Sequence, residues 1–343
     1  MILMNIYEAL VKEWDYLAPH DQKAITISNT ARSQFDFKVL PRRYGNDTAV
    51  VCFLINNSDY LKETIEFFDG KVDKIYVDVE QKQDIDLYNE SRKLIRHSKL
   101  ITVKPNDIAI ESCDLLLRKM FDDNLSQKNM AIIGTGNLAS KIALRMAERQ
   151  ARVFIEGRSK EKEKMIINGI NSFLPAYTSP INTMNQWDQA KPFDAVISFL
   201  SGPYWAESKL LPSIKNKTLI VDGGISNFSS EFIQSMLKQD VNITRLDVRF
   251  ALPYQFMDTM QDTTTFYEDI YGIKNIGDHS IVAGGYIGHE GSIIVDQIKR
   301  PTQIIGIADG MGGVKSNNDL SGKDHKAIEF IQDTIKAGCQ IAE

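Results

Sequence analysis

Lys104 and Asp107 stand three positions apart in the segment KPND, directly after a short apolar run. A lysine beside a carboxylate can donate a proton to a developing alkoxide while the carboxylate orients the lysine. The two residues could therefore form a catalytic acid–base pair. The alternative is structural, with Asp107 as the N-cap of the next helix and Lys104 in solvent.

Three further side chains are candidates for holding a substrate. Arg42, next to Arg43, could bind a carboxylate through two parallel hydrogen bonds. Arg249 ends a predicted strand and could hold a substrate or pair with Asp247. His289 stands between glycines, in GYIGHEG, and could act as a general acid on a mobile loop. The alternatives are a solvated surface for Arg42 and a hairpin tip for His289.

A separate segment is suited to binding a dinucleotide. The apolar run 130–133 predicts a buried strand, and a glycine turn and a helical pattern follow it. Gly134 permits a tight turn, Gly136 lets a pyrophosphate approach the backbone, and Ala139 lets the helix pack closely on the strand. Backbone N–H groups at the helix start would face the phosphates. The expected phosphate loop comprises Gly134, Thr135, Gly136, Asn137, Leu138 and Ala139.

Glu156 follows the next predicted strand, residues 151–155. It lies about 20 positions after the first glycine, where an acidic side chain commonly hydrogen-bonds the adenosine ribose. The charge of Glu156 would repel a 2′-phosphate, which favours NAD as the cofactor. Arg158 and Ser159 could instead hold that phosphate, so NADP stays open as the alternative.

The nicotinamide side of such a site is expected at the ends of two further strands, because ligands bind beyond the carboxyl ends of the strands in an open α/β sheet. The predicted strands are residues 193–200 and 218–221. The residues selected are Phe199, Leu200, Ser201, Asp222, Gly223 and Gly224. The Asp-Gly-Gly segment could equally be a plain turn. In the N-terminal part, the same rule selects Asn56, Asn57, Glu80 and the KPND segment.

The elements that would carry these residues alternate between strands and helices, which predicts an α/β fold with a doubly wound parallel sheet. We expect a smaller N-terminal α/β domain, residues 1–124, that supplies substrate-binding and catalytic groups. A Rossmann dinucleotide-binding domain, residues 125–319, follows it. The β-rich, glycine-rich extension at 251–319 could form a subunit or substrate interface, and residues 320–343 are expected to form a returning C-terminal helix.

The apolar patterns also place individual elements within these domains. In the N-terminal part, strands are expected at 49–55, 72–79 and 99–103, and helices at 60–68, 84–97 and 108–123. In the nucleotide part, a helix over 206–214 and a strand over 243–250 continue the alternation.

The composition is that of a folded globular protein, since 43% of the 343 residues are hydrophobic and 25% are charged. A net charge of −5 offers no basic surface for nucleic acid. No apolar run is long enough for a membrane span, and the amphipathic start does not resemble a signal peptide. Cys52, Cys113 and Cys339 form no CxxC pair, which favours reduced thiols in the cytoplasm. No metal site is expected, because the histidines show no metal-binding spacing.

The chain resembles the Rossmann-type NAD(P)-dependent oxidoreductases in which an amino-acid-dehydrogenase-like catalytic domain comes first. In shikimate/quinate dehydrogenases, EGRSKEK would correspond to the loop after the second strand and FDAVISFLSG to the nicotinamide-side strand. KPND takes roughly the place of their catalytic aspartate motif. Ornithine cyclodeaminase/μ-crystallin proteins are similar in length and in IIGTGNLAS.

These resemblances imply an NAD(P)-dependent dehydrogenase or reductase. Such an enzyme would transfer a hydride between nicotinamide and a small polar metabolite, of hydroxy or amino acid type, in an interdomain cleft. The sequence also leaves open whether the chain forms a homodimer. One alternative is a non-redox enzyme with tightly held NAD, as in a cyclodeaminase. The other is a dinucleotide-binding protein without catalysis.

Overall fold

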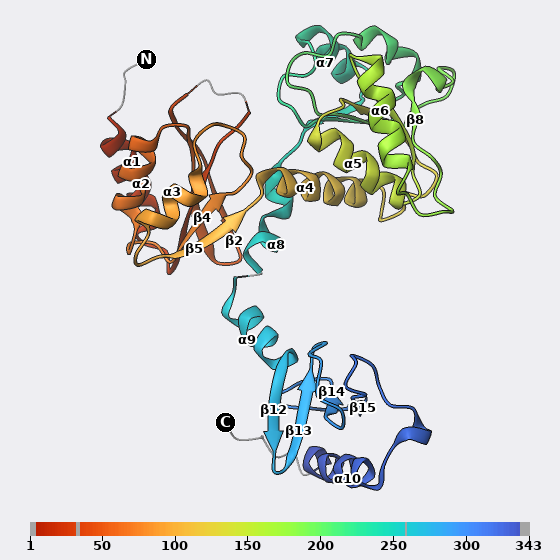
Figure 1. The fold of residues 1–343 in the computed structure, drawn as a ribbon. Helices are drawn as coiled ribbons and strands as arrows, with labels where there is room; N and C mark the ends of the chain where they lie inside the picture. Colours follow the sequence, from red (N-terminus) through yellow and green to blue (C-terminus); the bar gives the residue numbers. More distant parts are fainter. Residues whose placement is uncertain (1–4, 32–34, 258, 337–343) are drawn as a thin grey trace. The chain divides into compact units, whose positions relative to one another are not determined.

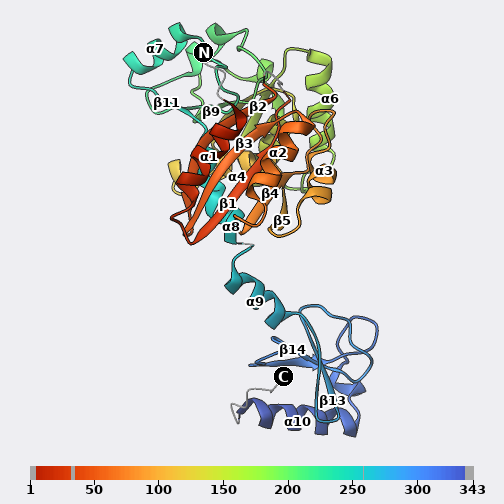
Figure 2. The same ribbon diagram turned by 90° about the vertical axis from the view of Figure 1, so that its left-hand side faces the viewer.

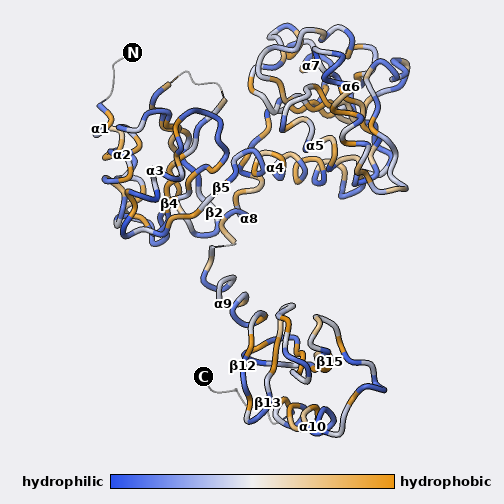
Figure 3. Tube along the Cα trace, in the orientation of Figure 1, coloured by the Kyte–Doolittle hydropathy of each residue, from blue (hydrophilic) through white to orange (hydrophobic). Residues whose placement is uncertain are grey.

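The computed structural model describes residues 5–31, 35–257 and 259–336. The chain divides into two compact units, Met1–Gln255 and Phe256–Glu343, and both are drawn in Figure 1. The first unit carries two sheets and the second carries a smaller sheet. Hydrophobic residues concentrate along the strands of these sheets (Figure 3). Cys339 and the end of the expected C-terminal helix lie outside the described residues.

The N-terminal sheet has five strands in the order β2-β3-β1-β4-β5. All neighbouring strands are parallel except β2 and β3, which are antiparallel. Apolar side chains of the strands pack against helices in a buried cluster. Figure 2 draws the strands and helices of this part as a ribbon. The elements are α1 Ile6–Leu17, β1 Gln22–Ser28, β2 Phe37–Gly45, β3 Thr48–Ile55, α2 Ser58–Phe68, β4 Lys74–Asp78, α3 Leu87–Leu94 and β5 Lys99–Val103.

Strands β1 and β2 were not expected from the sequence. β1 (QKAITIS) begins with polar residues, and β2 (FKVLPRRYG) contains a proline and two adjacent arginines. Pro41 is tolerated because β2 is an edge strand and its register against β3 shifts between Leu40 and Arg43. The tertiary position of β2 thus overrides its weak local pattern.

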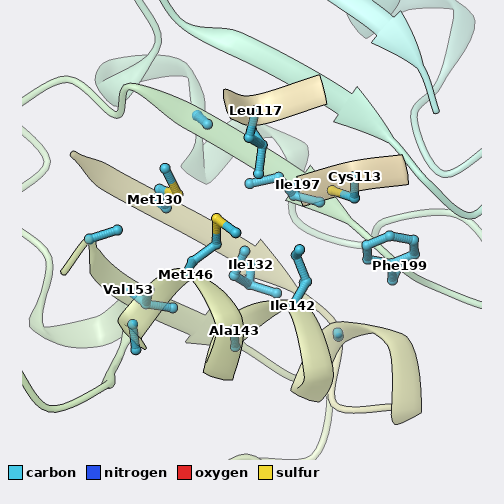
Figure 4. Close-up of a cluster of buried hydrophobic side chains, with 14 of the residues drawn as sticks. Cys113, Leu117, Met130, Ile132, Ile142, Ala143, Met146, Val153, Ile197 and Phe199 are labelled. Carbon is cyan, nitrogen blue, oxygen red and sulfur yellow. The ribbon is translucent and has the colours of Figure 1, made fainter. Parts of the chain in front are cut away.

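Helix α4, Pro105–Met120, follows the N-terminal sheet and packs on the next one. It begins three residues earlier than the expected 108–123, with Pro105 in the first turn, where a missing N–H costs nothing. Figure 4 shows Cys113 and Leu117 of this helix in the core of the nucleotide sheet, near Ile197.

The second sheet has six strands in the order β11-β10-β9-β6-β7-β8, and all neighbouring strands are parallel. Its first strand in the chain, β6, therefore lies between a half made by β7 and β8 and a half made by β9 to β11. This is the strand order of the Rossmann fold, so the expected fold class is confirmed. The strands are β6 Asn129–Ile133, β7 Arg152–Glu156, β8 Asn182–Thr183, β9 Ala195–Ser198, β10 Leu219–Asp222 and β11 Asn242–Arg245.

Helices cover both faces of this sheet. On β6, Met130 and Ile132 face the cluster with α4 and α5, whereas Ala131 and Ile133 face the opposite cluster with α7. This alternation follows from the two-residue period of a strand. The helices are α5 Asn137–Glu148, α6 Lys160–Asn171 and α7 Ser230–Lys238.

Two elements of the nucleotide part differ from expectation. The helix expected at 206–214 consists of two 3-10 turns, η2 Glu207–Lys209 and η3 Leu211–Ser213, because Pro212 cannot continue an α-helix. The strand expected at 243–250 ends at Arg245 and is followed by η4, Val248–Ala251. The Asp247 side chain caps η4 by accepting the backbone N–H of Arg249 at 2.9 Å.

The segment that returns to the N-terminal part is η4 with α8, Leu252–Met257. The Ser112 hydroxyl of α4 donates to the Val248 carbonyl at 2.8 Å. The Asn46 side chain donates to the Pro253 carbonyl at 3.1 Å. The expectation that the C-terminal helix returns to the N-terminal part was therefore wrong, because α10 packs on the sheet of the second unit.

The second unit joins the expected glycine-rich extension to the C-terminal helix. Its sheet has the order β12-β13-β14-β15, and Ala327 and Ile331 of α10 pack into the core of that sheet. Residues 256–319 therefore belong with the C-terminal helix in a unit of their own rather than with the nucleotide sheet. The elements are α9 Gln261–Ile270, β12 Gly272–Ile276, β13 His279–Ala283, β14 Ile293–Val295, β15 Ile304–Ile307, η5 Asn317–Asp319 and α10 Gly322–Lys336.

Candidate functional site

The glycine loop leaves the carboxyl end of the central strand β6 and enters α5. Gly134 has φ +131°, and a Cβ there would lie 2.7 Å from the Phe199 carbonyl oxygen and 3.1 Å from the Ala139 Cβ. The Gly134 N–H donates to the Glu156 carbonyl at 2.8 Å. Only glycine fits this turn, and a small residue at 139 allows the helix to approach it.

The start of α5 is open. Gly136 is its N-cap residue, and within the described part of the chain no side-chain hydrogen bond caps this end of the helix. A Cβ added to Gly136 would have no heavy atom of the described residues within 4 Å. Gly136 and Asn137 are exposed, and Leu138 is half-buried. The residues present therefore fit an anionic group, because uncapped N–H groups and the helix dipole face unfilled space.

Glu156 closes β7, but its carboxylate is buried, with only 2% of the residue exposed. The Tyr204 hydroxyl donates a hydrogen bond to Oε2 of Glu156, and Lys209 Nζ lies 3.6 Å from Oε1. Burial, followed by the hydrogen bond to Glu156, raises the pKa of Tyr204 above its ordinary value. The acid expected to meet a ribose is thus occupied by a tyrosine of the loop after β9.

The loop after β7 packs on the glycine loop. A Cβ on Gly157 would lie 2.5 Å from the Thr135 Cγ2, and the Gly157 N–H donates to Glu163 Oε2 at 2.7 Å. Ser159 is the N-cap of α6, and its side chain accepts from the Lys162 N–H at 3.3 Å. Arg158 is exposed. Of the two residues proposed to hold a 2′-phosphate, Ser159 caps helix α6 and Arg158 faces solvent.

The expected nicotinamide side is built around the ring of Phe199. A Cβ on Gly223 would overlap this ring, and a Cβ on Gly224 would overlap the Asn227 side chain and the Leu200 carbonyl. The Asp222 carboxylate accepts from the N–H groups of Gly224 and Asn227, at 3.1 Å each. The Asp-Gly-Gly segment therefore shapes its own turn and leaves room for the Phe199 ring.

Asn227 links the loops after β9 and β10, and it was not predicted from the sequence. The residue is fully buried. Its Oδ1 accepts from the Ser198 hydroxyl at 2.8 Å and from the Leu200 N–H at 3.0 Å. Its Nδ2 donates to the carbonyls of Leu200, at 3.1 Å, and Gly202, at 3.0 Å. Oδ1 therefore accepts two hydrogen bonds and Nδ2 donates two, which is the capacity of a side-chain amide. A polar residue five positions after a strand gives no local signal for such a role.

The backbone before Asn227 is strained. Ile225 has φ +63° and Ser226 has φ +57°. The left-handed region is costly for a β-branched side chain such as that of Ile225, and such outliers gather at functional sites. Ser201, across the linked loops, is exposed. The carboxyl edge of the sheet is therefore a constrained surface with exposed polar groups.

Lys104 and Asp107 are paired, but Asp107 does not cap the helix. Lys104 occupies the N-cap position of α4 without a side-chain cap. Asp107 forms an ion pair with Lys104 and a second with Lys141 of α5, the latter at 2.5 Å. Burial raises the pKa of Asp107, but the two ammonium groups outweigh it and hold the pKa below its usual range. The hydrogen bond to Asp107 raises the pKa of Lys104.

Asp107 is also the first rung of a ladder of ion pairs between α4 and α5. Glu111 pairs with Arg145 at 2.5 Å, and Asp114 pairs with Arg149 at 2.6 Å. The acids lie on one helix and the bases on the other, at spacings of about one helical turn. The pairing of Asp107 with Lys141 thus also sets the alignment of the two helices.

The three candidate substrate residues differ in their surroundings. Arg42 lies in β2, and its guanidinium binds the Glu13 carboxylate, with Nε 2.7 Å from Oε2. Arg249 forms an exposed ion pair with Asp247. His289 is exposed in the second unit. In the structure, Arg42 and Arg249 thus each bind a carboxylate of the protein itself.

No group of three or more His, Cys, Asp or Glu side chains in 5–31, 35–257 and 259–336 could hold a metal ion. Among the described helices, none has both the length and the apolar character needed to cross a bilayer. Burial raises the pKa values of the Cys52 and Cys113 thiols, which disfavours the reactive thiolate.

No family model and no curated protein sequence matches the chain. Among solved structures, the A chain of dipicolinate synthase from Bacillus subtilis matches with 16% identity and a TM-score of 0.33, covering 71% of this chain and 97% of that one. A shikimate dehydrogenase in complex with NADP+ matches with 13% identity and a TM-score of 0.43, and the match covers 70% of this chain and 91% of that one. L-tryptophan dehydrogenase from Nostoc punctiforme matches with 11% identity and a TM-score of 0.44, covering 72% and 78%. The fold assignment therefore rests on the strand order rather than on these matches.

Proposed function

We propose that the chain is an NAD(P)-dependent oxidoreductase acting on a small polar metabolite. The observation that carries this proposal is the open, uncapped start of α5 at the end of the central strand of a Rossmann sheet. Gly134 makes the turn, and Gly136 leaves unfilled space beside the helix start. Together they supply a pyrophosphate site of the kind that dinucleotides use.

In this proposal, the backbone N–H groups at 137–139 hold the pyrophosphate, and Glu156 accepts a hydroxyl of the adenosine ribose. The ribose must displace the Tyr204 hydroxyl, which holds that carboxylate in the structure. The ring of Phe199 and the turn at 222–224 form the surface for the nicotinamide. The cofactor, when bound, supplies hydride transfer.

A side chain of the protein must donate or accept the proton that accompanies hydride transfer. We assign this task to Lys104, whose ammonium is held by Asp107. The raised pKa of Lys104 keeps it protonated at neutral pH, so it can place a positive charge, and a proton, at an oxygen of the substrate. Asp107 orients Lys104 and, with its lowered pKa, stays ionised.

A non-catalytic dinucleotide-binding protein is the second candidate, because the side chain of Lys104, to which we assign the proton, is 59% exposed and paired with Asp107 in the structure. Turnover separates the two. The purified protein should convert some member of a panel of hydroxy and amino acids with a change in reduced-nicotinamide absorbance. Dinucleotide binding with no turnover across the panel would favour the second candidate, and stoichiometric copurified NAD without net redox would favour the cyclodeaminase-like alternative.

The cofactor choice is tested by binding. Glu156 should make NADH bind about tenfold tighter than NADPH or more, because it repels a 2′-phosphate. Glu156→Gln keeps the acceptor oxygen and removes the charge. It should therefore reduce the difference between the affinities for NADH and NADPH. Glu161→Gln, at an exposed position of α6, is the matched control. Tighter binding of NADPH to the unmodified protein would refute the assignment to NAD.

A further inference from the structure

Lys209 lies beside Glu156, at the position that the proposed function gives to the adenosine ribose. Its ammonium Nζ is 3.6 Å from Oε1 of Glu156, and the other carboxylate oxygen, Oε2, accepts a hydrogen bond from the Tyr204 hydroxyl. The side chain of Glu156 is only 2% exposed, whereas that of Lys209 is 55% exposed. Lys209 is therefore the member of this ion pair that a ligand can reach directly.

The backbone that carries Lys209 is fixed by contacts of its own. Lys209 is the last residue of the 3-10 turn η2, and its N–H donates to the Ala206 carbonyl at 3.0 Å. At the start of the same turn, the Glu207 carboxylate accepts from the N–H and the hydroxyl of Ser229, at 2.6 Å each. The base of the Lys209 side chain is thus held in place, and its four-carbon stem lets the ammonium move between partners.

The charges at the ribose position are balanced rather than purely negative. The carboxylate of Glu156 is paired with the ammonium of Lys209. A second basic side chain, Arg158, is exposed two positions after Glu156 in the chain. The positive charge beside Glu156 partly offsets the repulsion of an incoming phosphate by the carboxylate.

The 2′-phosphate of NADPH would enter this part of the site. In a Rossmann domain, the acid at the end of the second strand hydrogen-bonds the ribose hydroxyl that carries the phosphate in NADPH. Glu156 holds that position, and Lys209 Nζ lies 3.6 Å from its carboxylate. Lysine binds phosphate as a point charge and needs no fixed orientation. The ammonium of Lys209 is therefore suited to pair with a phosphate on the ribose.

We propose that Lys209 binds the 2′-phosphate when the site takes NADPH, and that it thereby limits the preference for NADH that Glu156 creates. The inference rests on the proposed function, because it assumes that the glycine loop and Glu156 bind a dinucleotide. Two loops, one after β7 and one after β9, then set the choice of cofactor together. The alternative is that Lys209 only neutralises Glu156.

Calorimetric titration of NADH and NADPH into the full chain and into Lys209→Met tests the proposal. Loss of the ammonium should weaken NADPH binding at least about fivefold and NADH binding less than about twofold, because only NADPH carries the phosphate. Lys209→Arg keeps the charge and should bind NADPH within about twofold of the unmodified chain. Lys217→Met, at an exposed position before β10, is the matched control and should leave both affinities unchanged. Equal losses for the two dinucleotides in Lys209→Met, or no loss for either, would overturn the proposal.

A double variant separates a direct contact from neutralisation of Glu156. If Lys209 pairs with the phosphate, Lys209→Met should weaken NADPH binding at least as much in a Glu156→Gln chain as in the unmodified chain. If Lys209 only neutralises Glu156, its effect on NADPH should disappear in the Glu156→Gln chain, and the proposal would be wrong. Lys209→Gln, whose amide can still donate to Glu156, gives the same comparison with a smaller loss of stability.

The same titrations keep this inference apart from the proposed function. Binding of NADH and NADPH with no effect of Lys209→Met on NADPH overturns the role of Lys209 and leaves the oxidoreductase proposal intact. Binding of NADH without any binding of NADPH to the unmodified chain has the same consequence. If the unmodified chain binds neither dinucleotide, both proposals are refuted.

Discussion

The hydroxyl of Tyr204 donates a hydrogen bond to the buried carboxylate of Glu156, across the carboxyl edge of the nucleotide sheet. The two residues belong to different loops, after β9 and at the end of β7. In the proposed function, the adenosine ribose and Tyr204 compete for this carboxylate. On that proposal, the hydrogen bond of Tyr204 to Glu156 lowers the affinity of the site for a dinucleotide.

Tyr204→Phe should raise the affinity for NADH about fivefold, because the ribose no longer displaces a hydrogen bond of about 1 kcal/mol. The free energy of unfolding should fall by about 1–3 kcal/mol, because Glu156 loses its donor. Calorimetric titration and urea unfolding measure the two effects. Tyr177→Phe, at a fully exposed tyrosine, is the control. An affinity that stays the same or falls would show that Tyr204 does not compete with the ligand.

Asn227→Ala should lower the free energy of unfolding by about 2–4 kcal/mol, since buried partners of both amide atoms lose their hydrogen bonds. Urea denaturation measures this change. Asn124→Ala, at an exposed site, should change the value by less than about 0.5 kcal/mol. Should Asn227→Ala behave like Asn124→Ala, the link between the loops after β9 and β10 would carry no stability.

The ion pairs of Asp107 should make stability depend on acid pH. Its pKa is lower in the folded chain than in the unfolded chain, so its stabilising contribution is present above about pH 4 and is lost as the pH falls through the lowered folded pKa. Asp107→Asn should therefore flatten the decline of the unfolding free energy below about pH 4. An unchanged slope in this variant would mean that the pairs with Lys104 and Lys141 do not form in solution.

Lys104→Met should lower kcat by about 10²–10⁴-fold, the usual range for a general acid, once a substrate is found. Affinity for NADH should hardly change, because Lys104 is not part of the glycine loop. Lys119→Met, also on α4 and exposed, is the matched control. A kcat equal to that of the control would remove Lys104 from the reaction and leave the α4–α5 ladder as the role of Asp107.

The strands β6, β7, β9 and β10 could be predicted from the sequence because they are mostly buried and read as continuous apolar runs, as in residues 130–133. The two-residue strand β8 was not predicted, because Asn182 and Thr183 form no apolar run. Gly134 and Ala139 could be identified because the tight turn and the close packing of the helix on it admit few residue types at these positions. Strand β2 could not be predicted, since its pairing with β3 and its edge position, rather than its composition, make Pro41 acceptable.

The side-chain partners at the site were beyond prediction for a different reason. Tyr204 reaches Glu156 over 48 positions of sequence, and Asn227 reaches Leu200 over 27. Such contacts depend on the packed arrangement of loops and leave no periodic pattern in the chain. Lys209 shows the same difficulty, because only the folded structure brings its ammonium to Glu156.

The most direct test of the central claim is calorimetric titration of NADH into the unmodified chain and into Gly136→Val. Gly136 has φ −89° and ψ −179°, a conformation open to valine, and a Cβ added there has no heavy atom of the described residues within 4 Å apart from its chain neighbours. Gly169→Val, at a helical glycine with equally open surroundings, is the matched control. We predict that the unmodified chain and Gly169→Val bind NADH, and that folded Gly136→Val binds it at least about a hundredfold more weakly, because the side chain fills the pyrophosphate space. Unchanged affinity in a folded Gly136→Val chain would contradict the account.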